Sequence, residues 1–291
     1  VCEYWYDGVD SNCDGADDFD WDDGGQRSQN HHDASGAPAG VDCFDPAVDD
    51  VLPAENGLAE AIEEHHGDDL APVREELSHH YQRSDLPDRA LVHLLAAGDA
   101  MTEVHAHGKA LEHYQHALMQ LEERDDRLSD WFANTERIGD SATVVGDLEL
   151  AQSSFEIVRE ARVEQEQACV ELDLYRVRAL RKLGKIEELR GDYPGALRLV
   201  REASEVVSRL SGEHRDQEQI QGLGQLSWLY VCSGDYDRAM KISGEGLSLA
   251  GDEEKTAEHA LFFSTIGSAS LCRGDLEQSL EFHRISLEIC E

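Results

Sequence analysis

The sequence predicts an all-α protein: an α-solenoid of stacked helical hairpins that follows an irregular, acidic, loop-rich segment. Three observations support this prediction. The composition changes near residue 57, apolar residues recur with a helical period from Leu58 onward, and a Gly-Asp pair returns four times in the later part of the chain. We therefore divide the 291 residues into an acidic segment, 1–57, and a helical repeat domain, 58–291.

The chain is strongly acidic, with 62 acidic residues against 25 lysines and arginines and a formal net charge of −37. Nucleic acids and anionic membranes attract basic surfaces, so neither is an expected partner. No apolar run approaches the roughly 18 residues that a membrane span requires, and membrane insertion is not expected.

Residues 1–57 hold fifteen acidic residues and a single arginine, without a helical period. Within them, the stretch DGVDSNCDGADDFDWDDG spaces oxygen ligands at alternate positions, as a calcium-binding loop does, with Gly15 at the sharp turn. A bound cation would neutralise the repulsion between these carboxylates. The predicted metal ligands are Asp10, Asn12, Asp14, Ala16 (through its carbonyl), Asp18 and Asp22. Trp21 stands where the usual glutamate belongs, and the alternative interpretation is a solvated acidic tail that binds nothing specifically.

The same segment resembles the metal-binding motif of the MopE copper-binding type, which reads roughly CDGxDNDCDGxxD, an Asp/Gly run, and DCDDxDxxxxPGAE. Cys13 and Cys43 match cysteines of that motif, whereas Tyr6 stands in place of its first cysteine. The resemblance implies copper, for which His31 and His32 lie near in the sequence. The carboxylate spacing itself favours calcium, so calcium is the expected cofactor and copper the alternative.

The Gly-Asp pairs stand in VVGDLELA, LRGDYPGA, CSGDYDRA and CRGDLEQS. Their glycines are Gly146, Gly191, Gly234 and Gly274, at spacings of 45, 43 and 40. We expect each glycine to end one helix in the left-handed conformation and each following Asp to cap the next helix. Pro194 then falls in the first turn of its helix, where a missing N–H costs little.

Small residues keep a second register through the same repeats. Five residues after the four glycines stand Ala151, Ala196, Ala239 and Ser279, and twelve residues before these stand Gly139, Gly184, Ser227 and Gly267. The same separation of twelve residues joins Gly98 to Ala110 and Ser78 to Ala90, so the helix near 88–105 serves two hairpins. We interpret the small residues as notches at which paired helices approach closely, in about six hairpins.

This pattern resembles the tetratricopeptide repeat (TPR), although its period is about 40 rather than 34 residues. Ile138, Leu183, Leu226 and Ile266 fill the bulky seventh position, and Tyr114 and Phe155 fill the aromatic twenty-fourth position. Residues 58–123 are also similar to the region that follows the nucleotide-binding module of large bacterial signalling ATPases. The chain has no GxxxxGK[ST] motif, so an ATPase of that type is not expected here.

The TPR resemblance implies a concave face lined by repeat positions 2, 5, 9 and 12 of each first helix. The candidate partner-binding residues at these positions are Arg178, Arg181, Lys185, Gln221 and Trp228. The cations favour a partner peptide with acidic residues or a free carboxylate. In the alternative, they pair with acids such as Glu171 and Glu188, and Trp228 belongs to the core.

The sequence shows neither GxSxG nor HExxH, and we do not expect an enzyme. The expected function is a cytoplasmic protein–protein interaction scaffold or sensor in signalling, with a protein or peptide in the TPR groove and a calcium-binding N-terminal motif. The alternative is a secreted or cell-surface metal-binding protein, for calcium or copper, in which the helices are a support.

Overall fold

The computed structural model of this chain describes residues 46–67, 69–121, 124–162, 166–251 and 256–291. In this part of the chain the secondary structure is helical, with twelve α-helices and no strand. The helices are α1 (Pro46–His66), α2 (Arg74–Gln82), α3 (Pro87–Glu103), α4 (His107–Leu121), α5 (Leu128–Val145), α6 (Leu148–Glu160), α7 (Glu166–Arg190), α8 (Tyr193–Val207), α9 (Gly212–Cys232), α10 (Tyr236–Ala250), α11 (Ala257–Arg273) and α12 (Leu276–Cys290). None of these helices is both long and apolar enough to cross a membrane.

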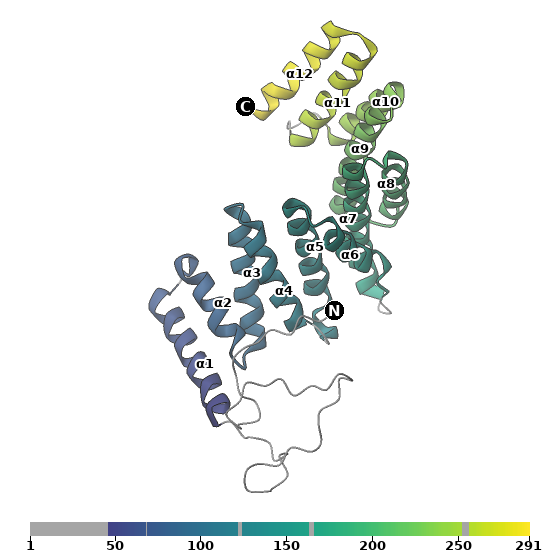
Figure 1. Cartoon of the computed structure of the whole chain (residues 1–291). Helices are drawn as coiled ribbons and strands as arrows, with labels where there is room; N and C mark the ends of the chain where they lie inside the picture. Colours follow the sequence, from purple (N-terminus) through teal and green to yellow (C-terminus); the bar gives the residue numbers. More distant parts are fainter. Residues whose placement is uncertain (1–45, 68, 122–123, 163–165, 252–255) are drawn as a thin grey trace, which may run out of the picture.

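Each helix packs against the next one along the chain, from α1 to α12, so the helices form a single curved stack (Figure 1). Contacts also join α5 to α7, α7 to α9, and α9 to α11. The first helices of successive hairpins therefore touch one another, and the second helices α6, α8 and α10 lie between them in the sequence. This arrangement confirms the predicted all-α solenoid.

The turns inside the hairpins form as the sequence predicts. Gly146, Gly191, Gly234 and Gly274 all have left-handed backbone angles, with φ between +79° and +88°. The four aspartates that follow them cap the next helix: the Asp147 carboxylate, for example, accepts a hydrogen bond of 3.0 Å from the Leu150 N–H. Pro194 lies in the first turn of α8. The end of one helix and the start of the next are thus both determined locally, by the Gly and the Asp of the pair.

The predicted notches are real points of close approach. A Cβ added to Gly98 would lie 2.4 Å from the ring of Tyr114, and one added to Gly139 would lie 2.4 Å from the ring of Phe155. In each case an aromatic side chain of the second helix rests on the bare backbone of the first. The small residue and the bulky residue of the repeat are therefore two halves of one contact.

The first helix differs from the sequence-based prediction. α1 begins at Pro46, inside the segment 1–57 for which the sequence predicts irregular structure. Pro53 and Gly57 both fall within α1, and both residue types weaken a helical pattern, which is why no period is visible there. Whether 1–57 and 58–291 behave as separate domains stays a prediction.

Candidate functional site

The candidate partner-binding residues lie on two first helices that contact each other. Arg178, Arg181 and Lys185 belong to α7, and Gln221 and Trp228 belong to α9. We call the face that α5, α7, α9 and α11 present at these residues the ladder surface. Its members are Glu136, Asp140, Arg178, Arg181, Lys182, Lys185, Glu188, Glu218, Gln221, Trp228 and Leu261.

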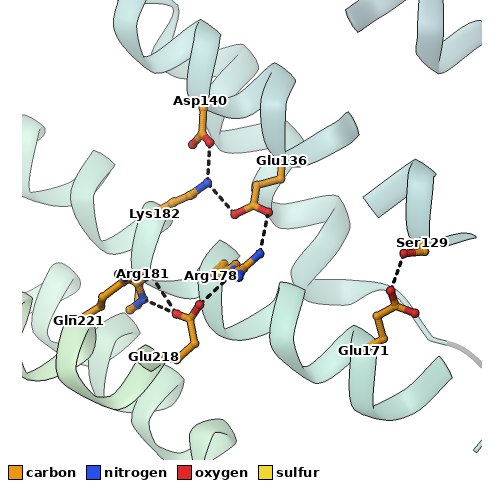
Figure 2. A network of polar contacts seen from close by, with 9 residues as sticks. All are labelled: Ser129, Glu136, Asp140, Glu171, Arg178, Arg181, Lys182, Glu218 and Gln221. Atoms are coloured by element: carbon orange, nitrogen blue, oxygen red, sulfur yellow. Dashed lines mark hydrogen bonds and ion pairs between the residues drawn. The ribbon is translucent and has the colours of Figure 1, made fainter. Parts of the chain in front are cut away.

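Glu218 of α9 is the acid that organises the two arginines. The residue is only 1% exposed, and its carboxylate accepts hydrogen bonds from Arg178 at 2.8 Å and from Arg181 at 3.2 Å. Arg181 also donates to the side-chain oxygen of Gln221 (Figure 2). Two of the five predicted residues are thus brought together by a buried carboxylate that the sequence analysis did not single out, and Gln221 joins them through Arg181.

The other side of α7 is paired with α5. Lys182 lies 2.6 Å from a carboxylate oxygen of Glu136 and 2.6 Å from one of Asp140, and Glu136 also lies 3.7 Å from Arg178 (Figure 2). We call the six charged residues Glu136, Asp140, Arg178, Arg181, Lys182 and Glu218 the charge network. It joins three consecutive hairpins through three acids and three bases, so its charges balance.

The environment shifts the pKa of Arg178. Burial lowers the pKa of the Arg178 guanidinium, but its hydrogen bond to Glu218 and the charge of Glu136 outweigh burial, so the pKa lies above its ordinary value. Arg178 therefore stays charged at any physiological pH.

Lys185 and Trp228 meet at a second acid. Glu188 accepts a hydrogen bond of 2.8 Å from Lys185 and one of 3.0 Å from the indole N–H of Trp228. Trp228 is 37% exposed, so it does not belong to the core, and the hydrogen bond to Glu188 fixes the orientation of its indole. Of the two acids considered as partners from sequence, Glu188 takes this role, whereas Glu171 accepts a hydrogen bond from Ser129.

An apolar side chain of α11 continues the surface beside Trp228. Leu261 is exposed and lies over Gly224, where an added Cβ would come within 2.9 Å of its Cδ2 atom. Gly224 and Trp228 are one turn apart on α9 and share a face. Leu261 and Trp228 therefore lie on the same side of α9, where Trp228 is bonded to α7 and Leu261 comes from α11.

The predicted metal ligands lie in a part of the chain that the structure does not describe. Asp10, Asn12, Asp14, Ala16, Asp18 and Asp22 all lie outside the described residues. Within the described residues, no group of three or more His, Cys, Asp or Glu side chains could hold a metal ion.

Comparison with solved structures identifies the fold. The chain is similar to BtubC (BKLC) from P. vanneervenii, with a TM-score of 0.56 and 16% identity over 84% of this chain and 91% of that one. It is similar to the apo form of the quorum sensor NprR from B. thuringiensis, with a TM-score of 0.59 and 14% identity over 86% of this chain and 66% of that one. A third similar structure is the Rap conjugation gene regulator of the plasmid pLS20 in complex with the Phr* peptide, with a TM-score of 0.57 and 12% identity over 84% and 74%.

No protein-family description matches the sequence, and no curated protein matches it significantly. At identities of 12–16% the structural likeness shows the fold, a TPR-like α-solenoid, and leaves function to the residues of this chain. The TPR resemblance drawn from the sequence is confirmed at the level of the fold.

Proposed function

We propose that this protein is an interaction scaffold that binds a peptide segment of a partner on the ladder surface, at Trp228 and Leu261. The observation that carries the proposal is an exposed indole held in place by a hydrogen bond to Glu188. Exposed, oriented aromatic side chains are frequent anchors of protein interfaces because they bury a large area at a low cost in conformational entropy.

The arginines of the ladder surface are already paired with Glu218, so they are expected to contribute less to peptide binding than the sequence suggests. A carboxylate of the peptide would have to compete with Glu218 for Arg178 and Arg181, and Glu218 is already fully desolvated. Lys185 is the more accessible cation, with half of its side chain exposed and an i, i+3 partner in Glu188. Exposed pairs of this kind contribute only about 0–1 kcal/mol, so Lys185 can exchange its partner easily.

The geometry therefore favours a peptide with a large apolar side chain against Trp228 and a carboxylate within reach of Lys185. In this proposal, Arg178, Arg181 and Gln221 shape the surface rather than contact the peptide. Two of the similar solved structures contain peptides, NprR with its cognate peptide NprX and the pLS20 Rap regulator with Phr*, which supports a peptide as the kind of ligand.

A selection from a phage-displayed library of random linear peptides tests the proposal. We expect enriched peptides to bind the purified chain and to lose at least tenfold in affinity for Trp228→Ala, measured by fluorescence anisotropy. Met119→Ala is the matched control, because Met119 is an exposed apolar residue of the second helix α4. Equal affinity of the wild type and Trp228→Ala for every selected peptide is incompatible with the proposed site.

The N-terminal motif remains a separate proposal: residues 1–57 bind calcium, with copper as the alternative cation. Calorimetric titration of the full chain with each ion tests it, and the absence of heat for both ions removes the metal function. We retain a cytoplasmic, non-enzymatic signalling role as the expected setting of the scaffold. The secreted metal-binding alternative gains weight only if calcium or copper binds and no peptide does.

A further inference from the structure

Two tyrosines occupy the same position of the helical repeat. Tyr81 of α2 and Tyr230 of α9 each stand three residues after the small residue of their first helix, Ser78 and Ser227. Both tyrosines are buried, so each hydroxyl requires a hydrogen-bond partner. In the other four hairpins the same position holds Met101, Ala142, Glu187 and Ser270.

An arginine accompanies each tyrosine. Arg89 of α3 and Arg238 of α10 stand directly before the small residue of their second helix. Each guanidinium carbon lies 5.8 Å from the ring centre of the tyrosine in the same hairpin. The tyrosine and the arginine thus recur together, in the hairpins α2/α3 and α9/α10. The four hairpins without the tyrosine have Lys109, Leu150, Gly195 and Gln278 at the position of the arginine.

The α2/α3 hairpin shows what the tyrosine and the arginine bind together. One carboxylate oxygen of Glu63, from α1, accepts a hydrogen bond of 2.8 Å from the Tyr81 hydroxyl and one of 2.8 Å from Arg89. Arg89 also donates to the Tyr81 hydroxyl at 2.8 Å, and His93 lies 2.7 Å from the other carboxylate oxygen. In this hairpin the pair therefore binds a carboxylate that the chain itself provides.

The helix before α9 contributes the opposite charge. Arg201 of α8 donates a hydrogen bond of 2.6 Å to the Tyr230 hydroxyl, and its guanidinium carbon lies 5.8 Å from the ring centre. The hydroxyl accepts from Arg201 and therefore keeps its own hydrogen for another group. Among the described residues, no carboxylate pairs with Arg201 and no group accepts a hydrogen bond from Tyr230. Two arginines and a hydroxyl thus converge where the α2/α3 hairpin has an acid.

Two more cations lie beside these arginines. Arg198 of α8 and Lys241 of α10 each stand two residues after the small residue of their helix, so they occupy equivalent positions. Arg198 is one turn from Arg201, and Lys241 is one turn from Arg238, so each shares a helix face with its neighbour. All four side chains are exposed. We call these four cations and the Tyr230 hydroxyl the Tyr230 site.

The acids near the Tyr230 site hold its cations only weakly. Arg238 lies 3.2 Å from Asp235, and Lys241 lies 3.7 Å from Glu245. The side chains of both pairs are exposed to water. Exposed ion pairs contribute little and are screened by salt, so both cations can exchange their partners.

The charge of the whole chain limits the size of the ligand. A net charge of −37 repels a large polyanion such as a nucleic acid. A short segment with a few carboxylates can instead meet the four cations locally. Glu63 shows that a carboxylate has the geometry that a tyrosine and an arginine in this register bind.

We propose that the Tyr230 site binds a carboxylate of a short acidic segment of a partner protein. An Asp or Glu side chain of that segment takes the role toward Tyr230 and Arg238 that Glu63 has toward Tyr81 and Arg89. Arg201 supplies a further cation. The site belongs to the second helices α8 and α10, and it does not depend on the peptide function proposed for the ladder surface.

Hexaglutamate with blocked ends and a fluorescein label is the probe for the full-length chain. We expect saturable binding in fluorescence anisotropy at low salt, weakened at least tenfold by Arg201→Gln and at least fivefold by Tyr230→Phe. Tyr230→Phe is the decisive variant, because it removes the hydroxyl and leaves every charge of the chain in place.

Arg215→Gln is the matched control for the lost charge. Arg215 is an exposed arginine of α9, about 22 Å from Tyr230 along the helix, so its substitution should change the affinity less than twofold. Trp228→Ala should also leave the affinity unchanged, because Trp228 belongs to the ladder surface.

Circular dichroism of each variant establishes that it is folded before affinities are compared. Absence of saturable binding, equal binding by Tyr230→Phe and the wild type, or an equal loss for Arg215→Gln and Arg201→Gln overturns the proposal. A tenfold loss for Trp228→Ala also overturns it, because the acidic peptide then binds on the ladder surface.

Discussion

The centre of the stack and its C-terminal part differ in which side chains have partners within the chain. Between α5 and α9, six charged side chains neutralise one another across three helices, and their organising carboxylate, Glu218, is buried. Between α9 and α11, the apolar side chains of Trp228 and Leu261 remain exposed. In the first region the charged side chains are paired with one another, whereas the second region leaves apolar side chains exposed.

This difference assigns separate roles to the two regions. Breaking the charge network would leave uncompensated charge, so its residues fix how α5, α7 and α9 stack. Removing an exposed apolar side chain costs the free chain little, because the side chain is already in contact with water. Substitutions in the centre should therefore change stability, and substitutions in the C-terminal part should change binding.

The largest expected effect is that of Glu218→Ala in the centre. The substitution leaves Arg178 and Arg181 without their buried carboxylate and should lower the free energy of unfolding by about 3 kcal/mol. Urea denaturation followed by circular dichroism measures it. Glu277→Ala, an exposed acid of α12, serves as the control and should change stability by less than about 0.5 kcal/mol. Similar curves for both variants would show that the network does not hold the centre together.

Two equivalent positions in the C-terminal part provide the next test. Met240→Asp should destabilise the chain by about 2 kcal/mol, because Met240 packs in a cluster with Ala269. Leu280→Asp should change stability by less than about 0.5 kcal/mol, because the same position of α12 is open to water. If Leu280→Asp proves as destabilising as Met240→Asp, the Leu280 side chain is not open to water as the structure has it.

Two glycines inside helices, the notch residue Gly139 and the open Gly244, should give smaller effects of opposite sign. Gly139→Ala places a Cβ within 2.4 Å of the Phe155 ring and should cost about 1–2 kcal/mol in unfolding free energy. Gly244→Ala meets nothing within 4 Å in α10 and should stabilise the chain by about 0.5–1 kcal/mol, through helix propensity alone. Thermal denaturation of the two variants should shift the midpoint in opposite directions, and a shift in the same direction contradicts the close approach.

The smallest effect separates two neighbouring lysines. Lys182→Ala removes two ion pairs to α5 and should cost about 1 kcal/mol, whereas Lys185→Ala removes one exposed pair and should cost less than about 0.5 kcal/mol. Lys185→Ala should still weaken selected peptides that carry a carboxylate. A larger loss of stability for Lys185→Ala than for Lys182→Ala would reverse the assignment of the two lysines.

The local parts of the fold could be predicted from the sequence. A helix ends at Gly146 and restarts at the Asp147 cap because of conformations and hydrogen bonds within a few residues. Likewise, Gly139 and Phe155 have complementary sizes at a fixed separation inside one hairpin. The residues that form such a turn or contact all lie within one repeat. Because the same residues recur in successive repeats, the pattern can be recognised in the sequence.

The partners of the ladder residues could not be predicted in the same way. Arg178 meets Glu218 forty residues later, and Lys182 meets Glu136 in the preceding hairpin. These pairings depend on the offset at which successive first helices stack, which no local pattern encodes. In a chain so rich in carboxylates, a buried acid such as Glu218 cannot be distinguished from its exposed neighbours by sequence alone.

Photo-crosslinking of a library-selected peptide to the full-length chain, with the attachment sites mapped by mass spectrometry, tests the division between the two regions most directly. The proposed site predicts crosslinks within residues 221–231 of α9 and 261–268 of α11, and their loss in Trp228→Ala. Crosslinks confined to the second helices α4, α6 and α8, unchanged in Trp228→Ala, would place binding on the opposite side of the stack and contradict the assignment.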